Sequence, residues 1–261
     1  MKTDKVIRYV LPTAAFVAAI GLWEATVRIN QIPPVILPSP SLIATTLVKD
    51  WRTLFGSLEV TLGITLEALV AATAGGALLA LIFAQWRPIE YAFFPFAVIM
   101  QETPVVSIAP LLLIYLNPSV AVLVCAFLVA FFPILANTAL GLSSIDHNLL
   151  DLFQMYKASR WRQLLWLRIL SALPYFLGGL RIGGGLALIG AIVAEIAAGS
   201  AGQGAGLAFR IVESGYRLNI PRMFAALFLI SVTGVAIFLI TTALSHLMLR
   251  RWHDSARGRE T

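Results

Sequence analysis

The feature of this sequence that most limits its possible folds is a series of long apolar runs separated by short polar segments. About 20 consecutive apolar residues in a helix span a bilayer, and lipid tolerates only structures that satisfy their own backbone hydrogen bonds. Of the 261 residues, 59% are hydrophobic and 12% are charged, whereas soluble domains carry about 25% charged residues. The chain is therefore predicted to be an all-α, polytopic membrane protein.

Hydropathy places about six membrane-spanning helices along the chain. They are expected near residues 9–27, 58–83, 91–116, 119–140, 173–198 and 222–249. A proline-rich stretch follows the first span and leads into a predicted amphipathic helix over 41–55, capped by Ser39 or Ser41. We interpret 1–261 as one transmembrane domain, with a core at about 57–250 preceded by the N-terminal span and a periplasmic amphipathic segment within 9–56.

Lysine and arginine are unequally distributed between the two sides of this topology. One side carries Lys2, Lys5, Arg8, Arg87, Lys157, Arg160, Arg162, Arg168, Arg250, Arg251, Arg257 and Arg259. The other side carries Arg28, Lys49, Arg52, Arg210, Arg217 and Arg222. By the positive-inside rule the first side is cytoplasmic. Both termini and the long polar segment 143–168, which contains no Gly or Pro and is predicted to be helical, are then cytoplasmic.

The chain lacks the residues that most catalytic or cofactor sites need. A phosphate-binding Walker loop requires Gly-Lys followed by Ser or Thr, and none of the four lysines follows a glycine. The single cysteine, Cys125, lies in an apolar run, and the three histidines lie near membrane edges or tails. No basic stretch is interleaved with aromatic residues, which argues against nucleic-acid binding. We therefore expect membrane lipid as a partner, and no catalytic residue, metal or cofactor in this chain.

The third predicted span is interrupted by polar residues and proline. It contains Gln101, Glu102, Thr103 and Pro104, with Ser107 one turn later. Proline removes a helical hydrogen bond, and a broken polar helix at membrane depth is tolerated where it lines a cavity or is buried in protein. These residues are the candidate translocation path. The alternative is a helix that merely kinks around a packing neighbour.

Small residues recur along one face of the fifth predicted span. Gly179, Gly183, Ala187 and Ala191 are spaced four apart, which lets another helix approach closely. Glu195 is next on the same face. A carboxylate near the end of a span is expected to face protein or water, so Glu195 either extends outward to the interface or belongs to a dimer seam or gate.

The segment from Asp151 to Pro174 resembles the cytoplasmic signature loop of the permease subunits of binding-protein-dependent ABC importers. The best-matching parts are Ala158-Ser159-x-Trp161 and Ala172-Leu173-Pro174. The nitrate, sulfonate, taurine and pyrimidine-precursor branch is similar in three further places, which are Pro38-Ser39-Pro40, Gln101-x-x-Pro104 and Ala109-Pro110-Leu111. The loop departs from the pattern in four places, with Asp151 in place of Glu, Leu152-Phe153 in place of Ala-Ala, Lys157 at the position of a turn glycine and Leu170 in place of the first proline.

This resemblance implies an architecture and a set of partners. A second copy or a paralogue of the permease would pair with this chain in a bacterial inner membrane. The loop would form a coupling helix that docks on a cytoplasmic ABC ATPase, which holds the ATP and Mg, while an external solute-binding protein delivers the solute. The docking residues implied are Asp151, Tyr156, Lys157, Ala158, Ser159, Arg160 and Trp161.

Other functions remain open at this stage. A self-sufficient secondary transporter or channel would need ionisable groups at mid-membrane, for which the candidates are Glu67, Glu102 and Arg181. A membrane-embedded enzyme would need a nucleophile and a base. The loop could also be an amphipathic helix that lies on anionic lipid. The sequence does not distinguish sulfonate, taurine, nitrate, a pyrimidine precursor or another small organic solute.

Overall fold

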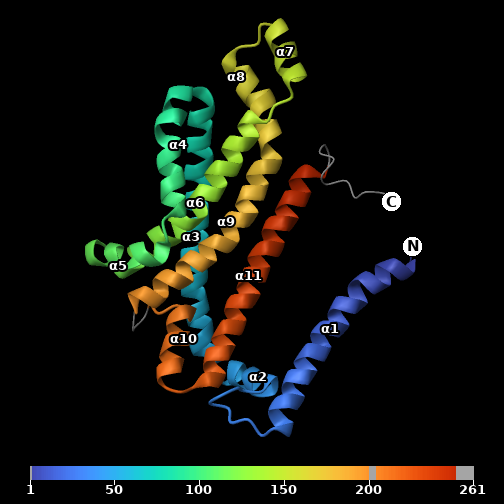
Figure 1. Ribbon diagram of the computed structural model, residues 1–261, viewed down its shortest axis with the longest axis vertical. Helices are drawn as coiled ribbons and strands as arrows, with labels where there is room; N and C mark the ends of the chain where they lie inside the picture. Colours follow the sequence, from blue (N-terminus) through green and yellow to red (C-terminus); the bar gives the residue numbers. More distant parts are fainter. Residues whose placement is uncertain (1, 200–203, 251–261) are drawn as a thin grey trace.

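The computed structural model describes residues 2–199 and 204–250, with side chains from residue 10 onward, and every element in these residues is helical (Figure 1). The elements are α1 (Lys2–Ile29), α2 (Pro40–Lys49), α3 (Trp51–Gln85), α4 (Arg87–Glu102), α5 (Val105–Tyr115), α6 (Pro118–Ser143), α7 (His147–Met155), α8 (Arg160–Gln163), the π-helix η1 (Leu164–Arg168), α9 (Ile169–Ala198), α10 (Leu207–Tyr216) and α11 (Ile220–Leu249). In these residues five helical stretches are long and apolar enough to cross a membrane, or six if the bent pair α4 and α5 counts as one span. The predicted all-α, polytopic fold is confirmed.

The centre of the bundle is the packing of α9 against α6. An added Cβ at Gly179 would lie 2.9 Å from the Asn137 Cβ and 3.2 Å from the Ile134 Cα. An added Cβ at Gly190 would lie 2.9 Å from the Ala126 Cα. Because apolar burial gives little drive for helix association in lipid, such close backbone approach supplies the packing contacts instead.

Helix α3 joins this pair with a row of small residues on its buried side. The row consists of Ser57, Thr61, Thr65, Ala68, Ala72, Gly76 and Ala80. Small side chains three and four positions apart form one face of a helix, so α3 approaches α6 and α9 along most of its length. Helix α11 completes the bundle.

The first helix stands away from this bundle (Figure 1). Only 6% of its apolar window is buried by the rest of the chain. Its connection to α2 is fixed by Glu24, whose carboxylate accepts hydrogen bonds from the Ser41 backbone N–H at 3.0 Å and the Ser41 hydroxyl at 2.8 Å. These bonds set the sharp turn between α1 and α2.

The predicted amphipathic helix over 41–55 is shorter than expected. Ser39 caps α2 by accepting from the Leu42 N–H, and α2 ends at Lys49. Asp50 has non-helical dihedral angles (φ −99°, ψ 16°), and its carboxylate accepts from Arg222 Nε at 2.6 Å. This ion pair to α11 holds the break, so residues 51–55 form the first turns of α3 instead.

The third predicted span, over 91–116, is two helices. The axes of α4 and α5 differ by 98°. Thr103 and Pro104 have extended dihedral angles, with ψ of 121° and 120°. Because the residue before a proline is disfavoured in the helical region, Thr103 ends α4 and the chain turns before α5 begins.

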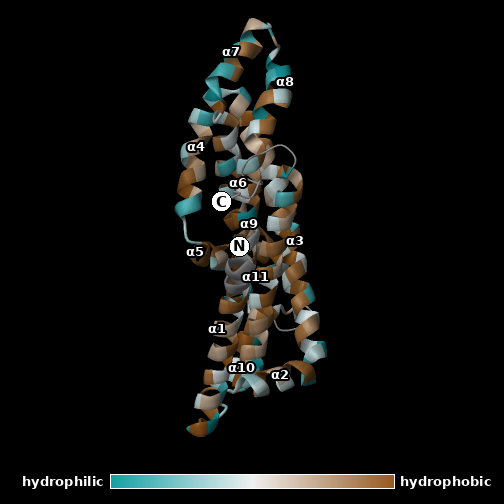
Figure 2. Cartoon of the chain, turned by 90° about the vertical axis from the view of Figure 1, so that its right-hand side faces the viewer, coloured by the Kyte–Doolittle hydropathy of each residue, from teal (hydrophilic) through white to brown (hydrophobic). Residues whose placement is uncertain are grey.

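The segment 143–168 projects beyond the bundle at the end opposite α2 and α10, and its helices carry many hydrophilic residues (Figures 1 and 2). The prediction of one helical segment is partly wrong, because residues 144–146 and 156–159 are not helical. Asp146 caps α7 by accepting from the Asn148 N–H at 2.9 Å, and Ser159 accepts from the Arg162 N–H at the start of α8. Polar side chains thus cap the first turns of α7 and α8, each of which follows a short non-helical stretch.

The contact between α6 and α9 can be tested with two adjacent glycines. We expect Gly179→Ala to lower the thermal unfolding midpoint by about 2–10 °C, because overpacking a close contact costs roughly 1–3 kcal/mol. Gly178→Ala is the control, since an added Cβ there meets nothing within 4 Å. Equal midpoints for the two variants in detergent would contradict the close packing.

Candidate functional site

The predicted translocation residues lie at the bend between α4 and α5. An open cavity of about 370 Å³ lies between this bend, α6 and α9, and its lining includes Gln101, Glu102, Thr103 and Pro104. Ser107 is exposed on α5 but does not line this cavity. The 98° change of direction is too large for a kink in one continuous helix. The role of these residues in translocation stays a prediction.

The small-residue face of α9 is covered within the chain itself. An added Cβ at Gly183 would lie 2.8 Å from the Ile134 Cδ1 and 3.2 Å from the Ala130 carbonyl oxygen of α6. Ala187 and Ala191, which continue the face, are fully buried. This face therefore packs on α6 of the same chain.

Glu195 points into the protein and is 5% exposed. One carboxylate oxygen accepts from the Thr61 hydroxyl at 2.8 Å, and the other accepts from the Ala208 backbone N–H at 3.0 Å. The Thr61 hydroxyl oxygen in turn accepts from the Leu207 N–H at 2.9 Å. This geometry excludes the alternative in which Glu195 extends outward. We call Thr61, Glu195, Leu207 and Ala208 the Glu195 cluster.

The Glu195 cluster provides hydrogen-bond acceptors for the backbone N–H groups at the start of α10. The first N–H groups of a helix have no partner within the helix, and the partial positive charge of this end favours an anion. Gly206, the capping residue, has no side chain to accept from these groups. An added Cβ at Gly206 would collide with the Glu195 carboxylate. The carboxylate of α9 therefore caps α10 from outside and ties both helices to α3.

Thr61 belongs to this cluster although no sequence motif singles it out. A sequence pattern could have indicated Thr61, because Ser57, Thr61 and Thr65 are hydroxyl residues spaced four apart on one face of a span. The spacing predicts a shared face but not a partner 134 residues away.

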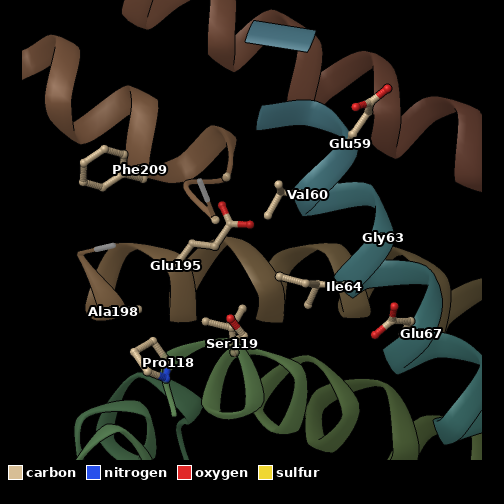
Figure 3. Close-up of a pocket in the computed structure, with 13 residues that line it drawn as sticks. Glu59, Val60, Gly63, Ile64, Glu67, Pro118, Ser119, Glu195, Ala198 and Phe209 are labelled. Carbon is tan, nitrogen blue, oxygen red and sulfur yellow. The ribbon is translucent and has the colours of Figure 1, made fainter. Parts of the chain in front are cut away.

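A second cavity, of about 290 Å³, borders Glu195 between α3, α6, α9 and α10 (Figure 3). Glu59 and Glu67 of α3 also line it, and both are exposed. No lysine or arginine is among the described residues that line this cavity. Because carboxylates in a span avoid lipid, we expect this side of α3 to face water or protein.

Arg210, Arg217 and Arg222 at this end of the bundle are held in ion pairs. Glu213 of α10 pairs with Arg210 at 2.8 Å and with Arg217 at 3.0 Å. The hydrogen bond from Arg210 is the main cause that lowers the pKa of Glu213 below its ordinary value. Arg210 also donates to the Ser57 hydroxyl at 2.9 Å, which attaches α10 to α3.

The predicted docking residues occupy α7, α8 and the turn between them. Tyr156 and Trp161 are 81% and 67% exposed, and Asp151 and Arg160 are also exposed. Ser159 caps α8, and the Ala158 N–H donates to the Phe153 carbonyl at 2.9 Å. The loop thus presents two exposed aromatic rings on either side of a defined turn.

Lys157, at the position of the expected glycine, has a φ of +49°. The left-handed turn therefore persists without glycine. A non-glycine residue in this conformation costs roughly 1–2 kcal/mol. The substitution strains the backbone here but does not change the helix–turn–helix form of the loop.

Comparison with known proteins decides the family. The family model for the binding-protein-dependent transport system inner membrane component matches residues 72–252. The chain belongs to this family of ABC importer permeases. The match covers the α4–α5 bend, the loop and the Glu195 cluster apart from Thr61, and it confirms the resemblance drawn from the motifs.

Two curated relatives extend the match toward the N-terminus. The permease is 33% identical over 240 residues to the riboflavin transport system permease protein RibX of Chloroflexus aurantiacus, covering 89% of this chain and 86% of that protein. It is also 33% identical over 242 residues to the formylaminopyrimidine transport permease protein ThiX of Halalkalibacterium halodurans, covering 91% and 94%. Among solved structures, an amino acid ABC transporter with histidines shares the fold, with a TM-score of 0.63 and 17% identity over 79% of this chain and 97% of that one.

Because of the Glu195 cluster, we expect that removal of the Thr61 hydroxyl strongly lowers the stability of this permease. Thr61→Val keeps the side-chain shape but leaves a Glu195 oxygen and the Leu207 N–H without a partner, which costs about 2–4 kcal/mol in total. Thr73→Val is the control, because the Thr73 hydroxyl donates to the Leu69 carbonyl of its own helix. We expect Thr61→Val to lower the unfolding midpoint by at least about 5 °C and Thr73→Val to change it little. Similar midpoints would count against the cluster.

Proposed function

We propose that this permease is one of two membrane subunits of an ABC importer in a bacterial inner membrane. A separate ATPase supplies the energy from the cytoplasm, and a separate binding protein delivers a small solute from outside. The observation that carries the proposal is the family match over residues 72–252, which includes the loop made by α7 and α8. The match to whole-length relatives supports the same assignment.

The surface of the loop supports ATPase docking. Besides Tyr156 and Trp161, it exposes Leu149, Leu152 and Met155 of α7, at 45%, 46% and 81%. Contiguous apolar and aromatic side chains at the tip of a projecting segment are typical of protein-docking surfaces, where aromatic residues contribute most of the binding energy. Lys157 and Arg160 add positive charge, and Asp151 adds negative charge, beside these groups.

The connection from the loop to the bundle supports transmission of movement. The stretch Arg160–Ala198 runs without interruption from α8 through η1 and α9. Its far end carries Glu195, and Gly190 within it borders the cavity at the α4–α5 bend. Energetic coupling is carried by rigid elements and packed contacts. A displacement of the loop would therefore reach both candidate sites through one helix.

The carboxylates around the second cavity favour one class of solute. Oxyanions are bound by arginine, lysine or backbone N–H groups, whereas this cavity has Glu59, Glu67 and Glu195. The relatives at 33% identity are named for riboflavin and formylaminopyrimidine. We infer that the solute is a nitrogen heterocycle with N–H donors rather than a sulfonate or nitrate.

Reconstitution tests the function. The permease is reconstituted into liposomes together with its ATPase and its binding protein. These proteoliposomes should take up labelled formylaminopyrimidine or riboflavin, and uptake should require ATP and be inhibited by vanadate. Transport by the permease alone without ATP would refute the importer assignment. ATP-dependent uptake of taurine or nitrate in preference to the heterocycles would refute only the solute class.

Docking is tested by removing one exposed ring. Trp161→Ala should weaken the binding of the purified ATPase by roughly 30-fold, as expected for an interface residue worth about 2 kcal/mol. Trp166→Ala is the matched control, because Trp166 is 70% exposed on η1 outside the docking residues. Dissociation constants that are unchanged by Trp161→Ala, or equally raised by both variants, would contradict this docking surface.

A further inference from the structure

A third cavity lies at the end of the bundle that carries the loop. Its volume is about 450 Å³, and it opens between the turn from α3 to α4 and the segment formed by α8 and η1. Three arginines line it, Arg87 from the start of α4, Arg160 from α8 and Arg168 from η1, together with Trp86 and Gln163. The cavity thus collects three positive charges from segments far apart in the sequence.

These charges have no carboxylate beside them in this cavity, and Glu90 lines a neighbouring cavity that Arg87 and Arg168 also border. No carboxylate lines the cavity, and none of the three arginines forms an ion pair with a carboxylate in the described part of the chain. Within residues 2–199 and 204–250, Arg168 donates one long bond, of 3.5 Å, to the Ala84 carbonyl. At the opposite end of the bundle Arg210, Arg217 and Arg222 are all paired. Since guanidinium groups that converge without a counter-ion repel one another, the cavity favours an anion.

The cavity lies at the depth of lipid headgroups. Trp86 immediately follows the apolar span α3 and is 54% exposed, and Trp166 of η1 is 70% exposed. Tryptophan is enriched where membrane meets water. The excess of lysine and arginine places this end at the cytoplasmic leaflet, whose anionic lipids attract basic pockets between membrane helices.

We propose that this cavity binds the phosphate headgroup of an anionic phospholipid. The three guanidinium groups provide the donors that a phosphate accepts, in the forked geometry that suits its oxygens. The acyl chains lie along the exposed apolar surface beside Trp86. The lipid joins the end of α3 to α8, and so it holds the base of the loop in place. An acidic segment of another protein is less suited, because Arg87 and Arg168 lie at the base of the loop and Arg160 alone of the three belongs to the proposed docking residues.

The experiment measures the thermal unfolding midpoint of the full-length permease in uncharged detergent. Dioleoyl phosphatidylglycerol at about a hundred times its dissociation constant should raise the midpoint by roughly 5–10 °C, whereas dioleoyl phosphatidylcholine should raise it much less. Arg87→Gln should weaken the phosphatidylglycerol response by at least about tenfold in affinity, because hydrogen bonds to a charged group are lost.

Two further variants make the test specific. Arg162→Gln removes the same charge from the same loop, but Arg162 does not line the cavity, so its response should match that of the unmodified chain. Arg160→Gln changes the opposite wall and should reproduce the Arg87→Gln result if the latter variant does not fold. Binding is measured on the permease without its ATPase, so the docking surface does not affect the readout.

Several outcomes would overturn the proposal. Equal responses to phosphatidylglycerol and phosphatidylcholine would exclude an anionic headgroup, and inorganic phosphate that reproduces the full shift would indicate a free-phosphate site instead. Loss of the response in Arg162→Gln to the same extent would indicate a general charge effect. Weaker ATPase binding by Arg87→Gln with an intact phosphatidylglycerol response would assign the cavity to protein docking.

Discussion

The close approach of α6 and α9 is the contact on which the rest of the structure depends. Glycines at the crossing bring the two backbones together, so that an added Cβ at Gly179 or Gly190 would contact backbone atoms of α6. In lipid, apolar surface alone does not select one neighbour over another. Small residues do so by their shape, and α3 adds its own row of small side chains to the same seam. The buried positions of Ala187 and Ala191 follow from this contact.

Around this rigid centre, two of the helix breaks are held by carboxylates that bind another helix. Asp50 ends α2 and pairs with Arg222, and the Glu195 carboxylate accepts from the start of α10. Thr103 and Pro104 break the third span beside a cavity. A backbone break inside a membrane is tolerated only next to protein or water. The break at Thr103 and Pro104 meets this condition, because it borders a cavity between α6 and α9.

The two ends of the bundle differ in how they treat positive charge. Arginines beside α10 are engaged by Glu213 or Asp50, and these pairs fix short helices to the core. The arginines beside α8 have no such partners among the described residues. Because a buried or converging charge needs an opposite charge nearby, the arginines beside α10 are neutralised within the chain. The arginines beside α8 depend on a counter-charge from outside the described chain. This is also the end at which the energy-supplying subunit is proposed to dock.

The sequence by itself determined the class of protein, the approximate positions of the spans and the loop that identifies the family. These properties depend on composition, period and short motifs, all of which are local along the chain. Lys157 shows the limit of a motif, since it stands at the position of a turn glycine and yet adopts a left-handed conformation, with a φ of +49°. The tertiary structure alone decided the 98° bend, the helix that covers the small face of α9 and the partners of Glu195. It also decided that Arg87, Arg160 and Arg168 meet at one cavity. Each of these depends on how helices distant in the sequence cross, and a local pattern shows that a residue needs a partner without showing which residue provides it.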